Sequence, residues 1–263
     1  MSKYKKPKKI SYQKIVNFFI KKGLKDLVDE SKKRELSVNE MKVKSPYKPD
    51  LDDLYRLYFY IFLNKRTTIL EFGSGWSTLI IALALTDLKK KYKKNMKFLR
   101  RNNPFELFIV DNEKKYLKIS KNRLKKFKRL INIKINFLFS DVRMTKINGK
   151  ICNEYIKLPI CSPDFIYLDA PDQFNIKGNQ NGININHIDM LPLNSDLIKI
   201  EYFLIPGTIV LLDGRGANAS FLKNNLQRKW RYNYEKKYDQ HVFHLDDNSI
   251  GKYNDLILDF YKN

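Results

Sequence analysis

Apolar segments of strand length alternate with helical segments through most of the chain, and no other feature limits the possible folds so strongly. The segments predicted to be buried strands are 68–72, 106–110, 133–140, 165–168 and 208–212. The segments predicted to be helices are 76–88, 114–130, 194–204 and 217–228. Strands and helices in this order predict an α/β fold, a Rossmann-like doubly wound sheet that is mostly parallel.

The end of the chain breaks this alternation. Within 230–245, aromatic and other apolar residues alternate with polar ones in two short runs that a brief connector separates. A connector this short joins antiparallel strands, because a parallel crossover needs about a dozen residues or more. We therefore expect the sheet to end in an antiparallel C-terminal hairpin.

The N-terminal part of the chain lies outside this pattern. Residues 1–9 are nearly all polar and are predicted to be a basic disordered tail. Residues 10–50 are expected to form an N-terminal helical arm and a polar connector. Asp50 is the expected N-cap of a further helix, which opens an α/β domain over residues 51–263.

Composition and length exclude several classes of protein. Hydrophobic residues make up 43% of the 263 residues, which is enough to bury a core. No apolar run approaches the ~20 residues of a membrane span, and the N-terminus lacks the apolar stretch of a secretory signal. The cysteines, Cys152 and Cys161, cannot form a disulfide framework, and no cysteine–histidine cluster has the spacing of zinc ligands. We expect a cytoplasmic protein of enzyme size.

The formal net charge of +23 would ordinarily indicate nucleic acid or an anionic membrane as a partner. Only 11 of the 51 basic residues are arginine, however, and phosphate-binding proteins usually favour arginine. Lys, Asn, Ile, Phe and Tyr are abundant together, and all have A/T-rich codons, so a biased genome explains much of the lysine excess. Biased composition is the preferred interpretation, and a nucleic-acid surface is the alternative.

The segment ILEFGSGWSTL, residues 69–79, carries the strongest signal of a ligand site. A predicted strand runs into Gly73-Ser74-Gly75, where the backbone can turn sharply, and a helix with free N–H groups follows. This arrangement suits either a dinucleotide or S-adenosylmethionine. A dinucleotide fingerprint requires a third glycine where this chain has Thr78, and the carboxylate of Glu71 suits a cationic ligand better than a pyrophosphate.

Acidic residues also follow the next two predicted strands. Asp111 could accept hydrogen bonds from both hydroxyls of a ribose, and Asp141 could accept one from an adenine amino group. Val142 would offer an apolar contact to the same base. The carboxyl ends of parallel strands form one edge, which is where open α/β proteins bind their ligands.

On these residues the chain resembles the class I S-adenosylmethionine-dependent methyltransferases. Glu71 to Gly75 matches the first motif of the family, Asp111 its ribose-binding acid and Asp141 its adenine-site acid. Asp169 in YLDAPD matches the fourth-strand motif beside the methyl group, and PGTIVLLDGR matches the fifth strand. The resemblance implies a methyltransferase-like domain with its terminal hairpin and S-adenosylmethionine as the cofactor. The implied cofactor-binding residues are Glu71, Gly73, Ser74, Gly75, Ser77, Asp111, Asp141, Val142 and Asp169.

The residues after the fourth strand bear on the acceptor. Members that methylate amino groups of flipped bases have an aromatic residue where this chain has Asp172, so amine methylation is disfavoured. Neither Cys152 nor Cys161 lies at a predicted strand end, which disfavours C5-methylation through a cysteine nucleophile. Asp169 and Asp213 are similar to the acids that hold a divalent cation in metal-dependent O-methyltransferases, so Mg²⁺ or Mn²⁺ is a candidate cofactor. Gly214 stands where a third, amide ligand is often found.

Three further residues are candidates for the acceptor site. His187 lies in a long loop and could accept a hydroxyl proton, so it is a candidate both for catalysis and for substrate binding, alongside Asp169 and Asp213. Asp172 and Arg215 are candidates for binding the acceptor, and Arg215 could hold an anionic group. A surface histidine and a surface arginine are the alternative interpretations.

The sequence therefore predicts a methyltransferase that acts on a hydroxyl of a small-molecule or saccharide acceptor, in the second case within polysaccharide biosynthesis. One alternative is an RNA methyltransferase that uses the lysine-rich surface. Another is a non-catalytic cofactor-binding module of a polysaccharide pathway.

Overall fold

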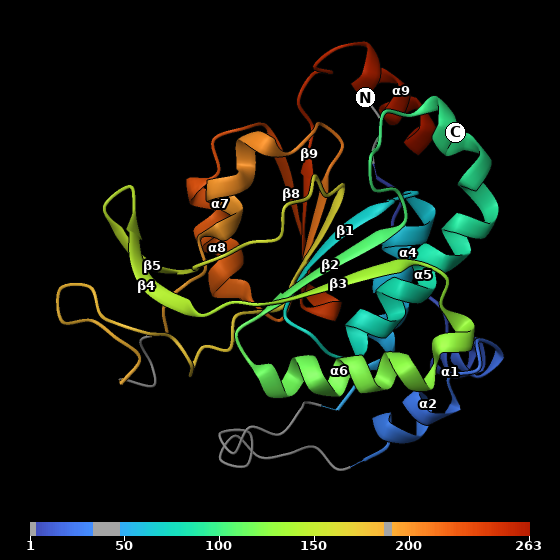
Figure 1. Cartoon of the computed structure of the whole chain (residues 1–263), viewed down its shortest axis with the longest axis horizontal. Coiled ribbons are helices and arrows are strands. Elements are labelled where there is room, and N and C mark those ends of the chain that lie inside the picture. Colours follow the sequence, from blue (N-terminus) through green and yellow to red (C-terminus); the bar gives the residue numbers. More distant parts are fainter. Residues whose placement is uncertain (1–3, 34–47, 187–190) are drawn as a thin grey trace.

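A seven-stranded sheet runs through the computed structural model, which describes residues 4–33, 48–186 and 191–263. The order of its strands is β3-β2-β1-β6-β7-β9-β8 (Figure 1). They are β1 (Thr68–Phe72), β2 (Glu106–Asp111), β3 (Lys134–Phe139), β6 (Phe165–Leu168), β7 (Ile209–Asp213), β8 (Trp230–Glu235) and β9 (Gln240–Leu245). The first five are parallel, while β9 runs antiparallel to both β7 and β8. The predicted Rossmann-like sheet with a C-terminal hairpin is confirmed.

Helices cover both faces of this sheet. The helices that follow or precede the strands are α4 (Leu51–Leu63), α5 (Trp76–Tyr92), α6 (Lys114–Lys126), α7 (Asp196–Ile200) and α8 (Gly216–Asn225). Ile69 of β1 belongs to the apolar core shared with α4 and α5, and Leu70 belongs to the core on the opposite face, shared with α7 and α8. Successive residues of a strand point to opposite faces, so each buried strand contributes to both cores.

The register of the parallel strands brings their acidic ends to one place. Tyr167 of β6 is paired with Glu71 on one side and Leu211 of β7 on the other. Counting two residues along β6 and β7 gives Asp169 and Asp213, which therefore lie on the same face of the sheet as Glu71. The face that these carboxylates share is the one that α4 and α5 cover.

The N-terminal segment is part of the domain. α1 (Tyr12–Lys21) and α2 (Lys25–Ser31) bury Ile15, Phe19 and Leu27 in the core that α4 and α5 share. Of the predicted disordered tail, residues 4–9 are described and lie against the domain: the Lys5 N–H donates to Asn64 Oδ1 at 2.6 Å. The expectation of a disordered tail is therefore wrong for residues 4–9. Their polar side chains alone would not fix this segment, but a backbone hydrogen bond and the buried Pro7 do.

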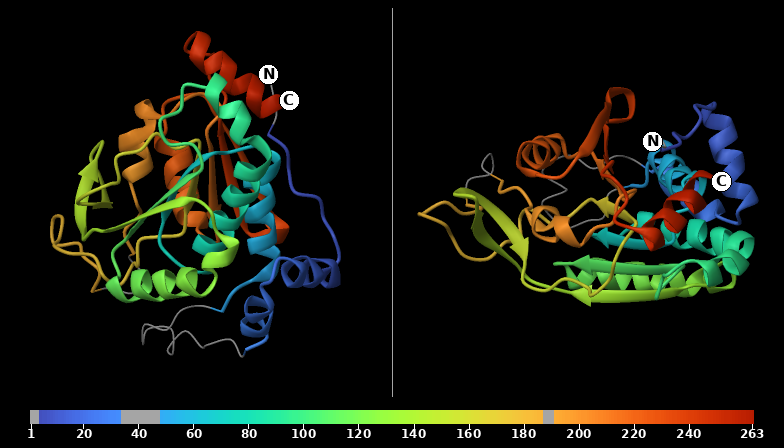
Figure 2. Two further views of the ribbon diagram at one scale, coloured as in Figure 1. Left: turned by 45° about the vertical axis from the view of Figure 1, so that its right-hand side comes forward. Right: turned by 90° about the horizontal axis from the view of Figure 1, so that it is seen from above.

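Two elements were not expected from the sequence. A hairpin of β4 (Val142–Ile147) and β5 (Lys150–Tyr155) projects from one end of the molecule (Figures 1 and 2). A last helix, α9 (Lys252–Lys262), lies beside the N-terminal segment, where Lys5 Nζ donates to the carbonyl of Lys262 at 3.3 Å (Figure 2). No helix in the described parts of the chain is both long enough and apolar enough to span a membrane.

Candidate functional site

The turn between β1 and α5 is held by close contact with the neighbouring strand. Gly73 has φ +96°, and its N–H donates to the carbonyl of Val110 at 2.8 Å. A Cβ at this position would lie 3.1 Å from Cβ of Ala170 and 3.4 Å from the carbonyl oxygen of Asp169. The positive φ and the close approach of the turn at 169–170 therefore both require a glycine here. The following Gly75 N–H donates to Thr78 Oγ1 at 3.1 Å and opens α5.

Glu71 is the most deeply buried of the predicted site residues. Its side chain is fully buried, and Oε1 accepts a hydrogen bond of 2.6 Å from Ser77 Oγ, while Oε2 has no partner in the described structure. Burial raises the pKa of Glu71 to about 8, against the opposing effect of hydrogen bonds from Ser77 and Thr78. The structure thus places Ser77 against Glu71 and leaves one carboxylate oxygen without a hydrogen-bond partner among the described residues, while the charge of Glu71 favours the protonated form of the Arg123 guanidinium.

Asp111 lies beside the same turn. Its Oδ2 accepts from Ser74 Oγ at 2.6 Å, and its Oδ1 accepts from the Glu113 N–H at 2.8 Å. Burial raises the pKa of Asp111 to about 6, although both hydrogen bonds act in the opposite direction. Ser74 and Asp111 are therefore brought together, and the serine orients the carboxylate.

The two residues predicted for the adenine site are placed differently from each other. Asp141 is partly exposed, and its Oδ1 is 2.8 Å from Nζ of Lys177. Val142 is 1% exposed and packs in the core on the α7 and α8 face. Asp141 is accessible to a ligand, whereas the side chain of Val142 is covered by the protein's own apolar residues.

The loop after β6 is fastened to the end of β2 by an asparagine that the sequence analysis missed. Asn112 Nδ2 donates to the carbonyls of Asp172 and Asn175, at 3.2 and 2.9 Å. Its Oδ1 accepts from the Asp172 N–H at 2.9 Å, and the carboxylate of Asp172 accepts from the Phe174 N–H at 3.0 Å. Asp172 therefore stabilises the loop. The sequence signal that could have identified Asn112 is its position, directly after Asp111 at the end of a predicted strand.

Asp169 and Arg215 form a connected pair at the ends of β6 and β7. Asp169 is half-exposed, and its Oδ1 lies 3.5 Å from Nε of Arg215. The same guanidinium donates to the carbonyls of Asp169 and Pro171, at 2.6 and 3.3 Å. Arg215 thus stabilises the turn at 169–171 through hydrogen bonds to its carbonyls, and it also places a positive charge beside Asp169. His187 lies outside the described residues.

Asp213 is the other acid of the predicted catalytic set. It accepts from the Tyr167 hydroxyl at 3.4 Å, and burial together with the charge of Asp169 raises its pKa to about 7. The described residues contain no group of three or more His, Cys, Asp or Glu side chains arranged to hold a metal ion. Asp169 and Asp213 alone do not fit a divalent-cation site here, because Arg215 already supplies the positive charge beside Asp169.

α4 adds a further carboxylate, Asp53, that was not identified from the sequence. Burial raises the pKa of Asp53 to about 8, and the charge of Asp213 is the next largest cause. Its Oδ1 accepts from Nε2 of Gln240 at 3.2 Å, and Oε1 of Gln240 accepts from Nε of Arg56 at 2.7 Å. Asp50 caps α4 as predicted, through hydrogen bonds to its first turn. The three acidic residues within 50–53 were the sequence signal for the helix cap and for the buried carboxylate of Asp53.

Carboxyl groups with raised pKa values therefore gather at the edge of the sheet where the parallel strands end, although the net charge of the whole chain is +23. The strand order, with β9 antiparallel between β7 and β8, decides the architecture. The chain has the class I methyltransferase fold. An acidic edge on this fold suits a ligand that carries positive charge.

Comparisons with solved structures return methyltransferases at TM-scores below 0.5. An S-adenosylhomocysteine-bound methyltransferase from Podospora anserina is 13% identical, with a TM-score of 0.42 over 92% of this chain and 99% of that one. An O-methyltransferase from Bacillus cereus in complex with S-adenosylhomocysteine is 11% identical, with a TM-score of 0.36 over 90% and 92% of the two chains. The O-methyltransferase TomG from Streptomyces achromogenes, involved in tomaymycin synthesis, is 13% identical, with a TM-score of 0.36 over 92% of each chain.

At these identities the likeness concerns the fold alone. No family model matches the chain, and no curated protein does.

Proposed function

We propose that the chain is an S-adenosylmethionine-dependent methyltransferase that transfers a methyl group to a hydroxyl of a small-molecule or saccharide acceptor. The single observation that carries the proposal is Glu71, a fully buried carboxylate beside the glycine turn with one oxygen unpartnered among the described residues. A buried acid in this state is stabilised by a cationic ligand, because the opposite charge offsets the cost of burial. S-adenosylmethionine carries a sulfonium and an ammonium group, and it supplies an electrophilic methyl when bound.

The residues around Glu71 can bind the rest of such a cofactor. The carboxylate of Asp111, which Ser74 orients, is suited to accept hydrogen bonds from the two ribose hydroxyls. Asp141 is partly exposed, and although Lys177 is paired with its Oδ1, the carboxylate could accept a hydrogen bond from the adenine amino group through its other oxygen. The first N–H groups of a helix have no acceptor within the helix, so anionic groups of a ligand are favoured at the start of α5.

Asp213 is the base that we propose for removing the proton of the acceptor hydroxyl. A general base is most effective when its pKa lies near the working pH, and Asp213 has a pKa of about 7. Asp169 is less suited to this role because the guanidinium of Arg215 is paired with it. Arg215 and Asp169 would instead contact the acceptor, and His187, which lies outside the described residues, stays a candidate for binding the acceptor and accepting its proton.

Thermal unfolding with added ligands tests the cofactor. S-adenosylhomocysteine at about 100 times its dissociation constant should add about 2.7 kcal/mol to the free energy of unfolding and raise the Tm. Glu71→Gln should abolish the shift, and Asp29→Asn, which removes an exposed carboxylate on α2, should leave it unchanged. Stabilisation by NAD in place of S-adenosylhomocysteine would contradict the proposal.

Methyl transfer from labelled cofactor to a panel of acceptors tests the acceptor class. Label should enter hydroxylated small molecules or saccharides, and the labelled product should be a methyl ether. Label that enters RNA alone would replace this acceptor with the RNA alternative. Cofactor binding without transfer to any acceptor class would favour the non-catalytic module. The proposed location is the cytoplasm, and the free thiols of Cys152 and Cys161 fit a reducing compartment.

A further inference from the structure

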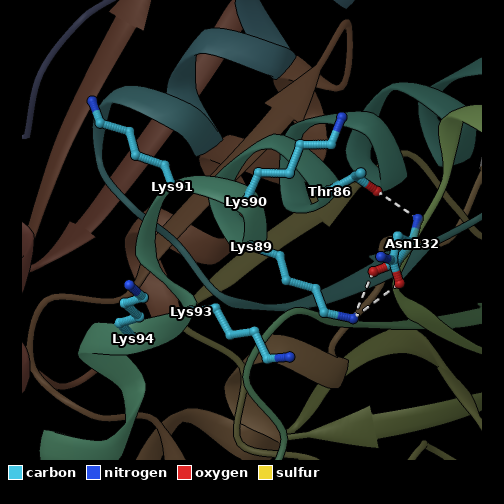
Figure 3. Close-up of a pocket in the computed structure, with 7 residues that line it drawn as sticks. All are labelled: Thr86, Lys89, Lys90, Lys91, Lys93, Lys94 and Asn132. Carbon is cyan, nitrogen blue, oxygen red and sulfur yellow. Dashed lines mark hydrogen bonds between the residues drawn. The ribbon is translucent and has the colours of Figure 1, made fainter.

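A hollow at the end of α5 is lined by lysines. Its volume is about 550 Å³, and its lining residues are Thr86, Lys89, Lys90, Lys91, Lys93, Lys94 and Asn132. Lys89 Nζ donates to the carbonyl of Asn132 at 2.7 Å, and the Asn132 N–H donates to Thr86 Oγ1 at 3.1 Å (Figure 3). These bonds join the end of α5 to the segment before β3 and fix the position of one ammonium group.

The hollow contains more positive charge than the protein's own acids neutralise. No carboxylate lines it among the described residues, and the nearest acid on α5, Asp87, already accepts from Lys22 Nζ at 2.5 Å and from the Tyr58 hydroxyl at 2.7 Å. The ammonium of Lys90 is 3.8 Å from Asp87. Lys91 also interacts with Lys65. Burial is the main cause that lowers the pKa of Lys65, and repulsion from the charges of Lys5 and Lys91 lowers it further.

The position of the hollow separates it from the candidate cofactor site. α5 begins directly after the glycine turn and runs for 17 residues. At 1.5 Å per residue its two ends are about 25 Å apart. The lysines therefore gather at the amino edge of the sheet, opposite the edge where Glu71 and Asp111 lie.

Phe98 is in the short helix that begins with two lysines of the hollow, Lys93 and Lys94, and its exposed ring, like that of Tyr253, is paired with a basic side chain. Phe98, in the short helix η1 (Lys93–Phe98), is 65% exposed, and Lys97 Nζ lies 4.8 Å from the centre of its ring. Tyr253 of α9 is 55% exposed, and the guanidinium of Arg100 lies 5.0 Å from its ring. Proteins that bind single-stranded nucleic acid combine a positively charged groove with aromatic rings on which unpaired bases stack.

We propose that the lysine hollow and the Phe98 ring form a binding surface for single-stranded nucleic acid, separate from the methyl-transfer site. The ammonium groups contact successive phosphates, and the exposed rings stack on bases. The described residues that line the hollow itself include no apolar side chain that could enter the lipid, so an anionic membrane would gain apolar contact from the exposed rings alone. A duplex is disfavoured because its bases are already stacked and offer no face to Phe98.

Fluorescence anisotropy with a 12-nucleotide oligouridine and the full chain tests the proposal. The matched pair of variants is Lys90, Lys91, Lys93 and Lys94→Gln against Lys150, Lys157, Lys229 and Lys236→Gln, four exposed lysines elsewhere on the surface. Both variants lose the same charge. If the four lysines of the hollow contact phosphates, raising the salt from 50 to 200 mM should weaken wild-type binding by roughly 50-fold through these contacts.

The hollow variant should lose most of that salt dependence, and the control variant should keep it. Phe98→Ala should weaken binding by at least about fivefold without changing the salt dependence. Equal losses in the two lysine variants would overturn the proposal, since net charge alone would then explain the affinity. Binding to phosphatidylserine vesicles without binding to the oligonucleotide would overturn it in favour of a membrane surface. Circular dichroism should show that each variant is folded, so that a loss of binding cannot be attributed to unfolding.

Discussion

Replacing Glu71 by glutamine should make the folded protein less sensitive to alkaline pH. The pKa of this carboxyl is about 8 in the folded chain against an ordinary value of 4.5, and each pKa unit corresponds to about 1.4 kcal/mol. Between these two values the folded chain binds more protons than the unfolded chain, so its stability falls as the pH rises through this window. For Glu71 the loss between pH 5.5 and pH 8 amounts to ~3 kcal/mol.

Glutamine keeps the shape of the side chain and an oxygen that can accept from Ser77, but it cannot ionise. The free energy of unfolding of Glu71→Gln, measured by urea denaturation, should therefore rise relative to wild type by ~3 kcal/mol between pH 5.5 and pH 8. Asp29→Asn should follow the wild-type pH profile, because Asp29 is exposed. A constant difference between Glu71→Gln and wild type across this range would refute the reasoning, since Glu71 would then be ionised in both states.

Other predictions follow from single contacts. The affinity for S-adenosylhomocysteine, measured by calorimetry, should rise from pH 6 to pH 8, because deprotonating Glu71 provides charge for the ligand's ammonium group. Gly73→Ala should lower the free energy of unfolding by about 1–3 kcal/mol in urea, because the positive φ and Ala170 both oppose a Cβ; unchanged stability would show that the turn can relax. Asp213→Asn should reduce kcat roughly 10²–10⁴-fold with little change in KM and remove the limb of the pH–rate profile near pH 7; a retained limb would assign it to another group. Deletion of residues 1–9 should lower the urea midpoint, because the backbone of Lys5 is hydrogen-bonded to Asn64 in both directions; an unchanged midpoint would mean that these contacts add nothing.

The core of the fold was predictable because its signals are local. β1 and β6 lie at the predicted residues, since short apolar strands flanked by helices differ clearly in period from their neighbours. The β4–β5 hairpin was missed although Asn148-Gly149, whose φ values are +48° and +74°, is a common two-residue hairpin turn. Its strands carry many polar residues, so the alternation that marks a strand is weak there.

Residues of the candidate site could be predicted where they lie in or directly after a predicted strand. They could not be predicted where contacts between distant segments bring them to the site. Glu71 and Asp111 are placed by the strands that carry them and were identified from those strands. Asn112, Asp53 and Gln240 reach the site through contacts between segments distant in sequence, which no local pattern reveals. Val142 shows the opposite error: an apolar residue at a strand end can turn into the core as easily as toward a ligand.

The contact between Lys5 and Lys262 brings the two ends of the described chain side by side at the amino edge of the sheet. Segments fused to either end would therefore extend from a place far from Glu71 and would not crowd the acceptor. The same proximity makes the chain suitable for circular permutation, in which a short flexible linker joins the old ends. New ends opened at the exposed Asn148-Gly149 turn would interrupt no strand of the main sheet.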